Sequence, residues 1–554
     1  MNTHTIKGKN IALTFDEASL SVEKIFSGST KVCSNASQKI YIRTSDAVFE
    51  PVLINKINKV ILEEDKITYA LQDESGDYKV NLIAATSSKG IKFSVKCRSK
   101  KPVWLFEWKL DGLDFEKVIV PSLGGQEISK EMTEGSTLSY KYPFWWNSQF
   151  VLGMFKRSGM ILRSEDSGTS LKLLRVSKEE EKFSLIFGFE AKAPLKKKEF
   201  YAEWFLDSFG KDWKEGADIH RSWMEKTFNL VPYKKHPHFP KWGSNINFVL
   251  ELWGARRDKE MPQHSFAQMR DRIDEFAKLH NPKNTLLYIP GFAEHGIDSN
   301  APSYNPSKQC GGDDEFALLV KHAHKLGYKV MIHTNVLAMT FTHPMYEKFK
   351  KYQVIDVFDR KQGWAMDMDG DWLTEPYFAY MNPGFKEWGN YMSKVLGELI
   401  EKYKLDGVFL DQTLLAFNIS KGPDFIEGMV NHIQKLQSSY PKVLFAGEGL
   451  HELNVRALPM AQIHGIDSIA EVHGMEGQIN WRKAHPISSY LFGKYTRYTA
   501  HLLTKHPSHP MFALQEDSYS KLNVIPALCL YNNNQALNMP EVKKMIQRGK
   551  KLKG

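Results

Sequence analysis

Two short stretches decide the fold of this chain: LDGVFLDQ at residues 405–412 and KVLFAGEG at residues 442–449. Each is an apolar run of strand length that ends in a carboxylate, Asp411 in the first and Glu448 in the second. A helical pattern over residues 424–438 separates them, as in the βαβ units of a parallel sheet. Because catalytic groups of such sheets stand at the carboxyl ends of the strands, the two carboxylates are predicted to lie close together there.

The same alternation continues on both sides of these stretches. Helices are predicted near residues 265–279, 314–326 and 385–403, and further strands at INFVLELW, TLLYIP, YKVMIHTN, IDSIAEVH, PMFAL and VIPALCLY. About eight strands in roughly 290 residues favour a (β/α)₈ barrel of the TIM type over residues 242–535. No GxGxxG motif follows the first strand, which argues against a dinucleotide-binding fold.

Residues 1–230 show a different pattern, with short alternating runs and few helical signals. Ile91, Phe93, Val95 and Cys97, for example, face one way between polar neighbours. This pattern predicts an N-terminal β-sandwich domain, so the chain combines a β domain with an α/β domain. Residues 231–241, VPYKKHPHFPK, contain three prolines and no periodicity, and they are predicted to form the linker between the domains.

The composition of the 554 residues is that of a globular protein, with 42% hydrophobic and 25% charged residues. No apolar run reaches the length of about 18 residues that a membrane span needs, so none is predicted. The first residues contain no apolar signal segment, which leaves open a cytoplasmic protein or a periplasmic one after processing. The four cysteines form no CxxC pair and are predicted to be free, mostly buried thiols.

The net charge of +10 raises the question of nucleic-acid binding. Residues 541–554 carry six lysines and arginines against one glutamate, so much of the excess lies at the end of the chain. We therefore predict a basic C-terminal tail over residues 536–554, solvated like a frayed helix end, and no nucleic-acid partner. The mild excess elsewhere is compatible with an anionic substrate.

The two strand-end carboxylates indicate glycoside hydrolysis. Retaining glycosidases use two carboxyl groups about 5–5.5 Å apart, and adjacent strands about 4.8 Å apart supply roughly that separation. Asp411 is predicted to be the nucleophile and Glu448 the general acid/base, with a pKa raised by burial or by the charge of Asp411. Gly447 and Gly449 are expected to leave room for a sugar. The alternative is that both carboxylates cap loop amides.

Other polar and aromatic side chains end the predicted strands or lie in loops near them. His333 and Asn335 share one side of a strand, and with Gln412 they could hydrogen-bond sugar hydroxyls. Flat rings could stack on a pyranose, although plain packing is about as common a role for them. The aromatic candidates are Tyr288, Trp253, Trp364 and Trp372.

Two stretches raise the question of a metal. Asp367, Asp369 and Asp371, in MDMDGDW, form a group that suits calcium, although the spacing is not that of an EF-hand and a solvated acidic turn is the alternative. His322 and His324 form an HxH motif within a predicted helix. Residues two apart on a helix do not face each other, which argues against zinc at that motif.

Together with the two strand motifs, the segment APSYNPSKQCGGDDEFALLVKHAHKLGYKVMIHTN at residues 301–335 resembles glycoside hydrolase family 129 and, more distantly, family 101. The resemblance covers the predicted barrel. It implies retaining enzymes that act on α-linked galactose-type sugars, with the nucleophile at Asp411 and the acid/base at Glu448. It also implies a calcium ion without fixing its ligands, and no cofactor is required for the chemistry.

We therefore expect an exo-acting retaining α-glycosidase whose partner is an oligosaccharide. Activities of the resembled family include release of α-N-acetylgalactosamine from mucin-type glycans and of α-linked 3,6-anhydrogalactose from carrageenan fragments, which are sulfated. The mild basic excess outside the tail favours carrageenan oligosaccharides, with α-N-acetylgalactosaminidase activity as the alternative. A non-catalytic carbohydrate-binding protein is an alternative of another class.

Overall fold

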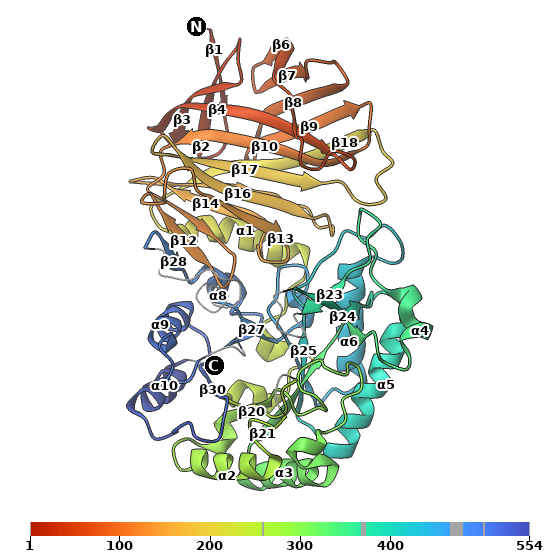
Figure 1. The fold of residues 1–554 in the computed structure, drawn as a ribbon. Helices are drawn as coiled ribbons and strands as arrows, with labels where there is room; N and C mark the ends of the chain where they lie inside the picture. The colour runs from red at the N-terminus through yellow and green to blue at the C-terminus, as the bar shows by residue number, and fades with distance from the viewer. Residues whose placement is uncertain (1, 258–259, 367–372, 466–479, 502–504, 553–554) are drawn as a thin grey trace. The chain divides into compact units, whose positions relative to one another are not determined.

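The computed structural model describes residues 2–257, 260–366, 373–465, 480–501 and 505–552 (Figure 1). The chain forms two compact units. The first comprises Met1–Asn229 and Gln478–Leu491, and the second comprises Leu230–Gly477 and Phe492–Gly554. A segment that the sequence placed within the barrel, at residues 478–491, therefore belongs to the first unit.

The first unit consists of two antiparallel sheets. One has the strand order β1-β2-β3-β4-β10-β17-β16-β13 with β5 beside β4, and the other has the order β28-β12-β11-β14-β15-β18-β9-β8-β7-β6. The elements of this unit are β1 (Thr3–Lys7), β2 (Ile11–Asp16), β3 (Ser21–Ser27), β4 (Thr30–Thr44), β5 (Val52–Leu53), β6 (Lys56–Glu63), β7 (Lys66–Gln72), β8 (Tyr78–Ser87), β9 (Gly90–Ser99), β10 (Val103–Leu113), β11 (Lys117–Val120), β12 (Gln126–Ser129), β13 (Thr137–Tyr142), β14 (Phe150–Met154), β15 (Gly159–Arg163), β16 (Lys172–Glu179), β17 (Lys182–Glu190), β18 (Glu199–Phe209), α1 (Trp213–Thr227), β28 (Arg482–Ala484) and the start of α8 (Ile487–Phe492).

Aromatic side chains join the inner faces of these two sheets. The ring of Trp108 on β10 lies 5.1 Å from that of Phe93 on β9 and 5.2 Å from that of Trp204 on β18, measured between centroids. Buried residues alternate along β9 as the sequence predicted, with Phe93, Val95 and Cys97 all inside. The N-terminal part is thus an antiparallel β-rich unit, consistent with the predicted sandwich.

The short strand β28 explains why residues 478–491 belong to this unit. It pairs antiparallel with β12, with Gln126 opposite Ala484. Gly125, just before β12, has φ +118, and a Cβ atom there would lie 2.0 Å from the carbonyl oxygen of His485. Only glycine allows that close approach of the two backbones. This pairing carries no sequence signal, because three residues are too few to show an alternation.

The second unit is built on eight parallel strands in the order β29-β27-β26-β25-β21-β20-β19-β30. A parallel bridge between Thr499 on β29 and Ile525, two residues before β30, brings the two edges together, so the barrel is nearly closed. The elements of this unit are η1 (Tyr233–Lys235), η2 (Lys241–Asn245), β19 (Phe248–Leu252), α2 (Phe266–Ala277), η3 (Pro282–Asn284), β20 (Thr285–Ile289), η4 (Lys308–Cys310), α3 (Gly312–Leu326), β21 (Lys329–Asn335), β22 (Ala338–Thr340), α4 (Tyr346–Phe349), η5 (Lys350–Tyr352), β23 (Gly363–Met366), β24 (Glu375–Tyr380), α5 (Lys386–Tyr403), β25 (Gly407–Asp411), α6 (Phe425–Ser439), β26 (Leu444–Gly447), η6 (Val455–Ala457), β27 (Met460–Ile463), β29 (Arg497–Ala500), α9 (Phe512–Leu522), β30 (Ala527–Leu530) and α10 (Pro540–Lys551).

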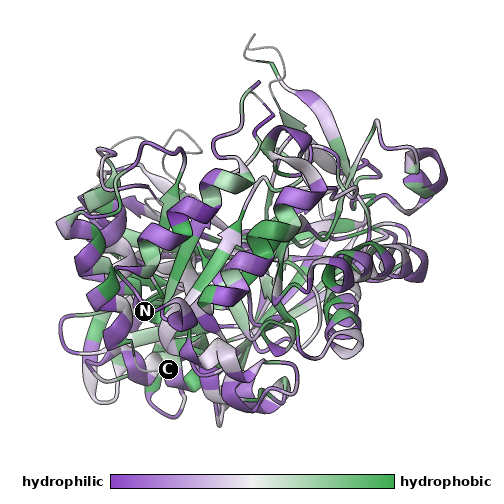
Figure 2. Ribbon diagram, turned by 90° about the horizontal axis from the view of Figure 1, so that it is seen from below, coloured by the Kyte–Doolittle hydropathy of each residue, from purple (hydrophilic) through white to green (hydrophobic). Residues whose placement is uncertain are grey.

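The helices of this unit begin and end where local chemistry allows. At the start of α2, the Ser265 hydroxyl accepts the N–H of Gln268, whose side chain accepts the N–H of Ser265, which is a capping box. Helix α3 ends at Gly327, which has φ +103. Figure 2 shows mainly hydrophobic strands in the centre and helices whose residues alternate between hydrophilic and hydrophobic, as expected for helices that cover a barrel.

Six of the eight strands, β19, β20, β21, β25, β26 and β30, occupy stretches that the sequence predicted. The prediction of a strand at PMFAL is wrong, because α9 begins at Phe512 and buries Phe512, Tyr519 and Leu522 at helical spacing. The predicted strand IDSIAEVH lies outside the described residues. The strands β27 and β29 were not predicted.

The end of the chain differs from the predicted tail. Helix α10 buries Val542, Met545 and Ile546, and its basic residues occupy the other positions. Arg548 donates from Nε and Nη2 to the Glu516 carboxylate at 2.7 and 3.0 Å. The residues predicted to form a solvated basic tail thus form an amphipathic helix that packs within its unit.

All four cysteines are free and buried, as predicted. Within the described residues, no helix combines the length and the apolar character that crossing a membrane would require.

Candidate active site

The two predicted catalytic carboxylates lie at the ends of neighbouring strands. Asp411 is the last residue of β25, and Glu448 directly follows β26. The strands pair in parallel with Leu410 opposite Gly447, and the N–H of Glu448 donates to the Leu410 carbonyl at 3.1 Å. The preceding strand residues are buried, whereas Asp411 and Glu448 keep partial exposure. Both acids can therefore meet a molecule that approaches the strand ends.

Gln412 links the two carboxylates. Its backbone N–H donates to Glu448 Oε2 at 2.9 Å, and its side-chain Nε2 donates to the Tyr380 hydroxyl at 3.2 Å. The φ of Gln412 is 63°, a left-handed conformation that costs a non-glycine residue about 1 kcal/mol. Because Gln412 directly follows Asp411, this backbone conformation points its N–H toward the Glu448 carboxylate. The bond is the kind of loop-amide contact that the capping alternative foresaw for Glu448.

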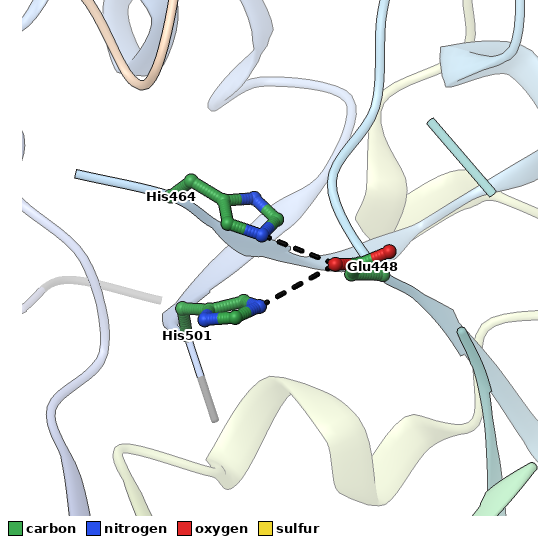
Figure 3. A group of neighbouring side chains, drawn as sticks. All are labelled: Glu448, His464 and His501. Carbon is green, nitrogen blue, oxygen red and sulfur yellow. Dashed lines mark hydrogen bonds and ion pairs between the residues drawn. The ribbon is translucent and has the colours of Figure 1, made fainter. Parts of the chain in front are cut away.

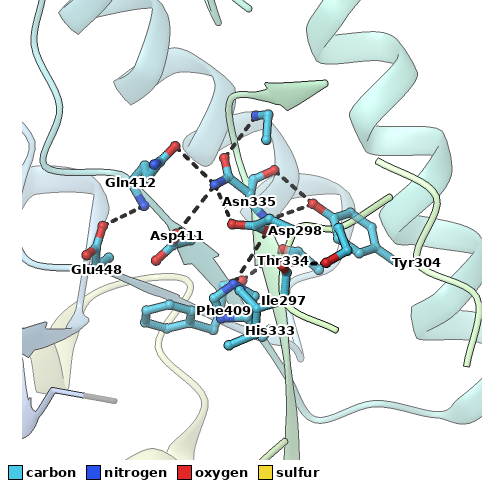
Figure 4. Close-up of polar contacts among 12 residues, drawn as sticks. Ile297, Asp298, Tyr304, His333, Thr334, Asn335, Phe409, Asp411, Gln412 and Glu448 are labelled. Atoms are coloured by element: carbon cyan, nitrogen blue, oxygen red, sulfur yellow. Dashed lines mark hydrogen bonds and ion pairs between the residues drawn. The ribbon is translucent and has the colours of Figure 1, made fainter. Parts of the chain in front are cut away.

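Asn335 at the end of β21 positions Asp411 and its neighbours (Figure 4). Its Nδ2 lies 2.9 Å from Asp298 Oδ2, 3.0 Å from Gln412 Oε1 and 3.4 Å from Asp411 Oδ2. Its Oδ1 accepts the backbone N–H groups of residues 337 and 338, both at 2.9 Å. These bonds use the hydrogen-bonding capacity of the amide. The Asn335 side chain is thus engaged within the site, whereas the Gln412 amide makes one bond through each of its polar atoms; a role of either residue in binding sugar hydroxyls stays a prediction.

Asp298 is a site residue that the sequence did not reveal. It lies in the loop after β20, with only 7% of its surface exposed, and its Oδ1 lies 3.5 Å from His333 Nε2. His333 Nδ1 in turn lies 2.6 Å from the Tyr288 hydroxyl. The chain of contacts from Tyr288 through His333 to Asp298 ends within 4.8 Å of Asp411. His333 thus lies in the site as a buried neighbour of Asp298, and Tyr288 as a buried partner of His333.

Two histidines that the sequence reasoning missed complete the site. His464 directly follows β27 and His501 directly follows β29, as Glu448 follows β26. Their Nε2 atoms lie 3.2 and 3.5 Å from Glu448 Oε1 (Figure 3). The signal that led to Glu448, a polar residue directly after a strand, would have led to both histidines had their strands been recognised.

The surroundings of the two acids move their pKa values in opposite directions. Burial raises the pKa of Asp411 well above its usual value, and the charges of Glu448 and Asp298 raise it further. Burial acts the same way on Glu448, but hydrogen bonds and charge from His464 and His501 outweigh it and lower the pKa of this carboxyl below its usual value. Burial and the neighbouring His464 lower the pKa of His501 to about 4.

The expected direction of the pKa shift of Glu448 was therefore wrong, because two imidazoles contact its carboxylate. The pair instead favours an ionised Glu448 beside a protonated Asp411. Two carboxyl groups that hold different charges at the same pH can take separate acid and base roles.

The remaining predicted residues differ in how far they are exposed and in what they pack against. Trp253 after β19 is 9% exposed and packs 5.4 Å from the Tyr531 ring, whereas Trp364 on β23 is 44% exposed. A Cβ atom on Gly447 would lie 2.5 Å from Thr413 Oγ1, so Gly447 makes room for packing and not for a sugar. Gly449 has φ +74, a conformation that favours glycine. The predicted residues Asp367, Asp369, Asp371 and Trp372 lie outside the described residues.

Solved structures of similar fold include those of the α-N-acetylgalactosaminidase NagBb from Bifidobacterium bifidum. Its GalNAc complex matches with a TM-score of 0.74 and 11% identity, and its ligand-free form with 0.73 and 11%. Its Gal-NHAc-DNJ complex matches with 0.73 and 12%. Each comparison covers 100% of this chain and 93% of the other. The chain therefore has the fold of these structures.

The chain belongs to the family described as a domain of unknown function, DUF6259, whose sequence profile matches residues 200–495. The match runs from β18 through the strands that carry Asp411, Glu448 and His464. No curated protein matches the sequence. Membership of glycoside hydrolase family 129, which the motifs suggested, stays a prediction.

Proposed function

We propose that this protein is a retaining α-glycosidase that removes α-linked galactose-type sugars from non-reducing ends. The observation that carries the proposal is the pair of acids, Asp411 and Glu448, presented side by side at the ends of adjacent parallel strands. The fold, which it shares with an α-N-acetylgalactosaminidase, supports the same choice.

In this proposal Asp411 attacks the anomeric carbon and forms a glycosyl ester, while Glu448 gives a proton to the departing oxygen and then activates water. Asn335 holds Asp411 in place, and the N–H of Gln412 fixes one oxygen of Glu448. Asp298 and His333, buried beside Asp411, are the groups we assign to sugar hydroxyls.

The protonation of the two acids has to reverse during the reaction. A nucleophile must be ionised and an acid protonated, whereas the free pair favours a protonated Asp411. Positive charge that develops on the anomeric carbon beside Asp411 favours its ionised form. The proton of the Asp411 carboxyl therefore has to pass to the Glu448 carboxylate, which then gives it to the leaving oxygen as ionised Asp411 bonds to the anomeric carbon.

The sugar itself is the finer part of the proposal. Net charge alone favoured sulfated carrageenan oligosaccharides, and the described residues of the site add nothing to that choice, since the groups next to the two acids are carboxylates, amides and imidazoles. We therefore put α-N-acetylgalactosaminides first and 3,6-anhydrogalactose-terminated carrageenan oligosaccharides second.

A calcium ion, implied by the resemblance, does not fit the described site. Two groups of three ionisable side chains lie close enough to share an ion, and each of them includes an imidazole. Calcium takes about six to eight ligands, all oxygens. No step of the proposed reaction is therefore assigned to calcium.

A screen of aryl α-glycosides tests the proposal. We expect hydrolysis of the α-N-acetylgalactosaminide or α-galactoside, slower or no reaction with the α-glucoside, and loss of activity in Asp411→Asn purified in the same way. A protein that binds these sugars without hydrolysing any of them, and that also leaves carrageenan oligosaccharides intact, would be a carbohydrate-binding protein and not an enzyme.

A further inference from the structure

Three consecutive strands of the barrel each deliver one ligand-type side chain to the same point. Glu448 follows β26, His464 follows β27 and His501 follows β29, and these strands are neighbours in the sheet. Figure 3 shows both imidazole rings turned toward the Glu448 carboxylate. A chain separation of 16 residues between Glu448 and His464, and a longer one to His501, excludes a merely local turn motif.

The two distances from Glu448 to the histidines match the edges of a metal coordination sphere. Glu448 Oε1 lies 3.2 Å from His464 Nε2 and 3.5 Å from His501 Nε2, and the three ligand atoms all lie within 4.8 Å of one another. An ion with bonds of about 2.0–2.2 Å separates its ligand atoms by about 3–3.5 Å. The two imidazole rings lie 3.8 Å apart between centroids, so they have to spread apart to share one ion.

The donor set selects the class of ion. Two imidazole nitrogens and one carboxylate oxygen are the protein ligands of many zinc sites and of several other transition-metal sites. The side chains of His464, Glu448 and His501 are only 6%, 15% and 5% exposed, so the ligand atoms are held among packed neighbours. Among the described residues, the ionic partners of Glu448 are these two imidazoles and no lysine or arginine.

A second group, formed by Asp298, His333 and Asp411, is the competing location. It offers a single imidazole, and the other nitrogen of His333 is bonded to the Tyr288 hydroxyl. Asp298 Oδ2 already accepts the Asn335 amide. The group around Glu448 is thus the better match for a borderline transition-metal ion.

We propose that Glu448 Oε1 and the Nε2 atoms of His464 and His501 bind one divalent transition-metal ion of the zinc class. The consequence for activity rests on the proposed function. If Glu448 is the acid/base, an ion that takes its carboxylate as a ligand removes the proton donor, so zinc is a reversible inhibitor of hydrolysis.

Binding is measured on the full-length protein after treatment with a chelator and its removal. Cobalt(II) is titrated by visible absorption and zinc by calorimetry. We expect one equivalent to bind to the wild type, and His464→Asn and His501→Asn each to weaken binding at least about 10-fold. His322→Asn is the matched control, since that histidine contacts Asp274 from α3 and binding should be unchanged.

Absence of cobalt binding, or binding that survives both His464→Asn and His501→Asn, contradicts the metal site. Binding that is lost in His333→Asn and kept in the other two variants places the ion at the competing group and also contradicts it. Thermal unfolding shows that each variant is folded. Zinc inhibition of aryl glycoside hydrolysis, reversed by chelator, is scored separately, so a metal-binding protein without hydrolysis would sustain the site and overturn the proposed function.

Discussion

Two aspartates bracket the strand β25 and show two uses of the same side chain. Asp406 precedes the strand, where its carboxylate lies 2.8 Å from Lys329 Nζ and 2.7 Å from His324 Nε2 and accepts the N–H of Val330 at 3.0 Å. Asp411 ends the strand among Asn335, Asp298 and Glu448. Asp406 thus has a lysine beside it, whereas the described neighbours of Asp411 are amides, acids and the imidazole of His333.

The pKa values record this difference. Burial would raise the pKa of Asp406, but the bonds from His324 and Lys329 outweigh it and lower the value. Burial also raises the pKa of Asp411, and nearby acids add to the increase. A carboxylate with its own cation stabilises the fold, whereas one left beside other acids can change its charge during a reaction. In a parallel barrel the reactive one stands at the carboxyl end of the strand, as Asp411 does.

The largest effect that separates the two residues is on turnover. Asp411→Asn should reduce kcat by more than about 10³-fold on every substrate, because an amide cannot form the glycosyl ester. Asp406→Asn should leave kcat within a few-fold of wild type. Steady-state kinetics on an aryl glycoside measures both, and equal losses in the two variants would remove the distinction between the two ends of β25.

A second large effect depends on the leaving group. Glu448→Gln should slow hydrolysis of natural glycosides by about 10²-fold or more, and it should spare the first step on substrates with activated phenol leaving groups. Pre-steady-state bursts on both substrate classes measure this step. Equal loss on both classes would mean that Glu448 caps the N–H of Gln412 and does not donate a proton.

A smaller effect is expected at the residue that positions Asp411. Asn335→Ala removes the Nδ2 donor from Asp411 and Asp298, so kcat should fall by about 10-fold to 10²-fold with a smaller change in KM. The lost donor also disfavours ionised carboxylates, so the acidic limb of the pH–rate profile should move to higher pH. A lower kcat with an unmoved pH profile would indicate a structural role alone.

The substitution with the smallest effect on activity, Asp406→Asn, is expected to lower the stability of the fold. Asp406→Asn breaks contacts with Lys329 and His324 and should lower the free energy of unfolding at pH 7 by about 2 kcal/mol. Because the folded pKa of Asp406 is lowered, its stabilisation is present above the unfolded value and is lost as the pH falls through the folded one. As the pH falls from the unfolded to the folded pKa of Asp406, the Asp406→Asn variant should therefore lose less stability than the wild type.

The dependence of stability on pH is expected to have the opposite sign for Asp411. Its raised folded pKa means that the folded state holds the proton more tightly, so stability declines as the pH rises from the unfolded value toward the folded one. Asp411→Asn should then be at least as stable as wild type at pH 7. Denaturant unfolding of the two variants at several pH values checks both signs, and a destabilised Asp411→Asn would contradict the assignment of charge.

The sequence could predict this part of the molecule because β25 and β26 are continuous apolar runs with an acid at the end. It could not predict β27 and β29, whose four residues each, MAQI and RYTA, are too short and too polar to stand out. His464 and His501 were missed with them. Asp298 was missed for another reason, since it reaches Asn335 across 37 residues from an irregular loop, and no local pattern records such a contact.

The central claim is that Asp411 acts as a nucleophile in a double displacement at the strand ends. Its most direct test is time-resolved NMR of the sugar released from an aryl α-glycoside by the wild-type protein. Two successive inversions predict that the α-anomer forms first and then equilibrates with the β-anomer. If the β-anomer forms first, a water molecule and not Asp411 attacks the anomeric carbon, and the account is contradicted.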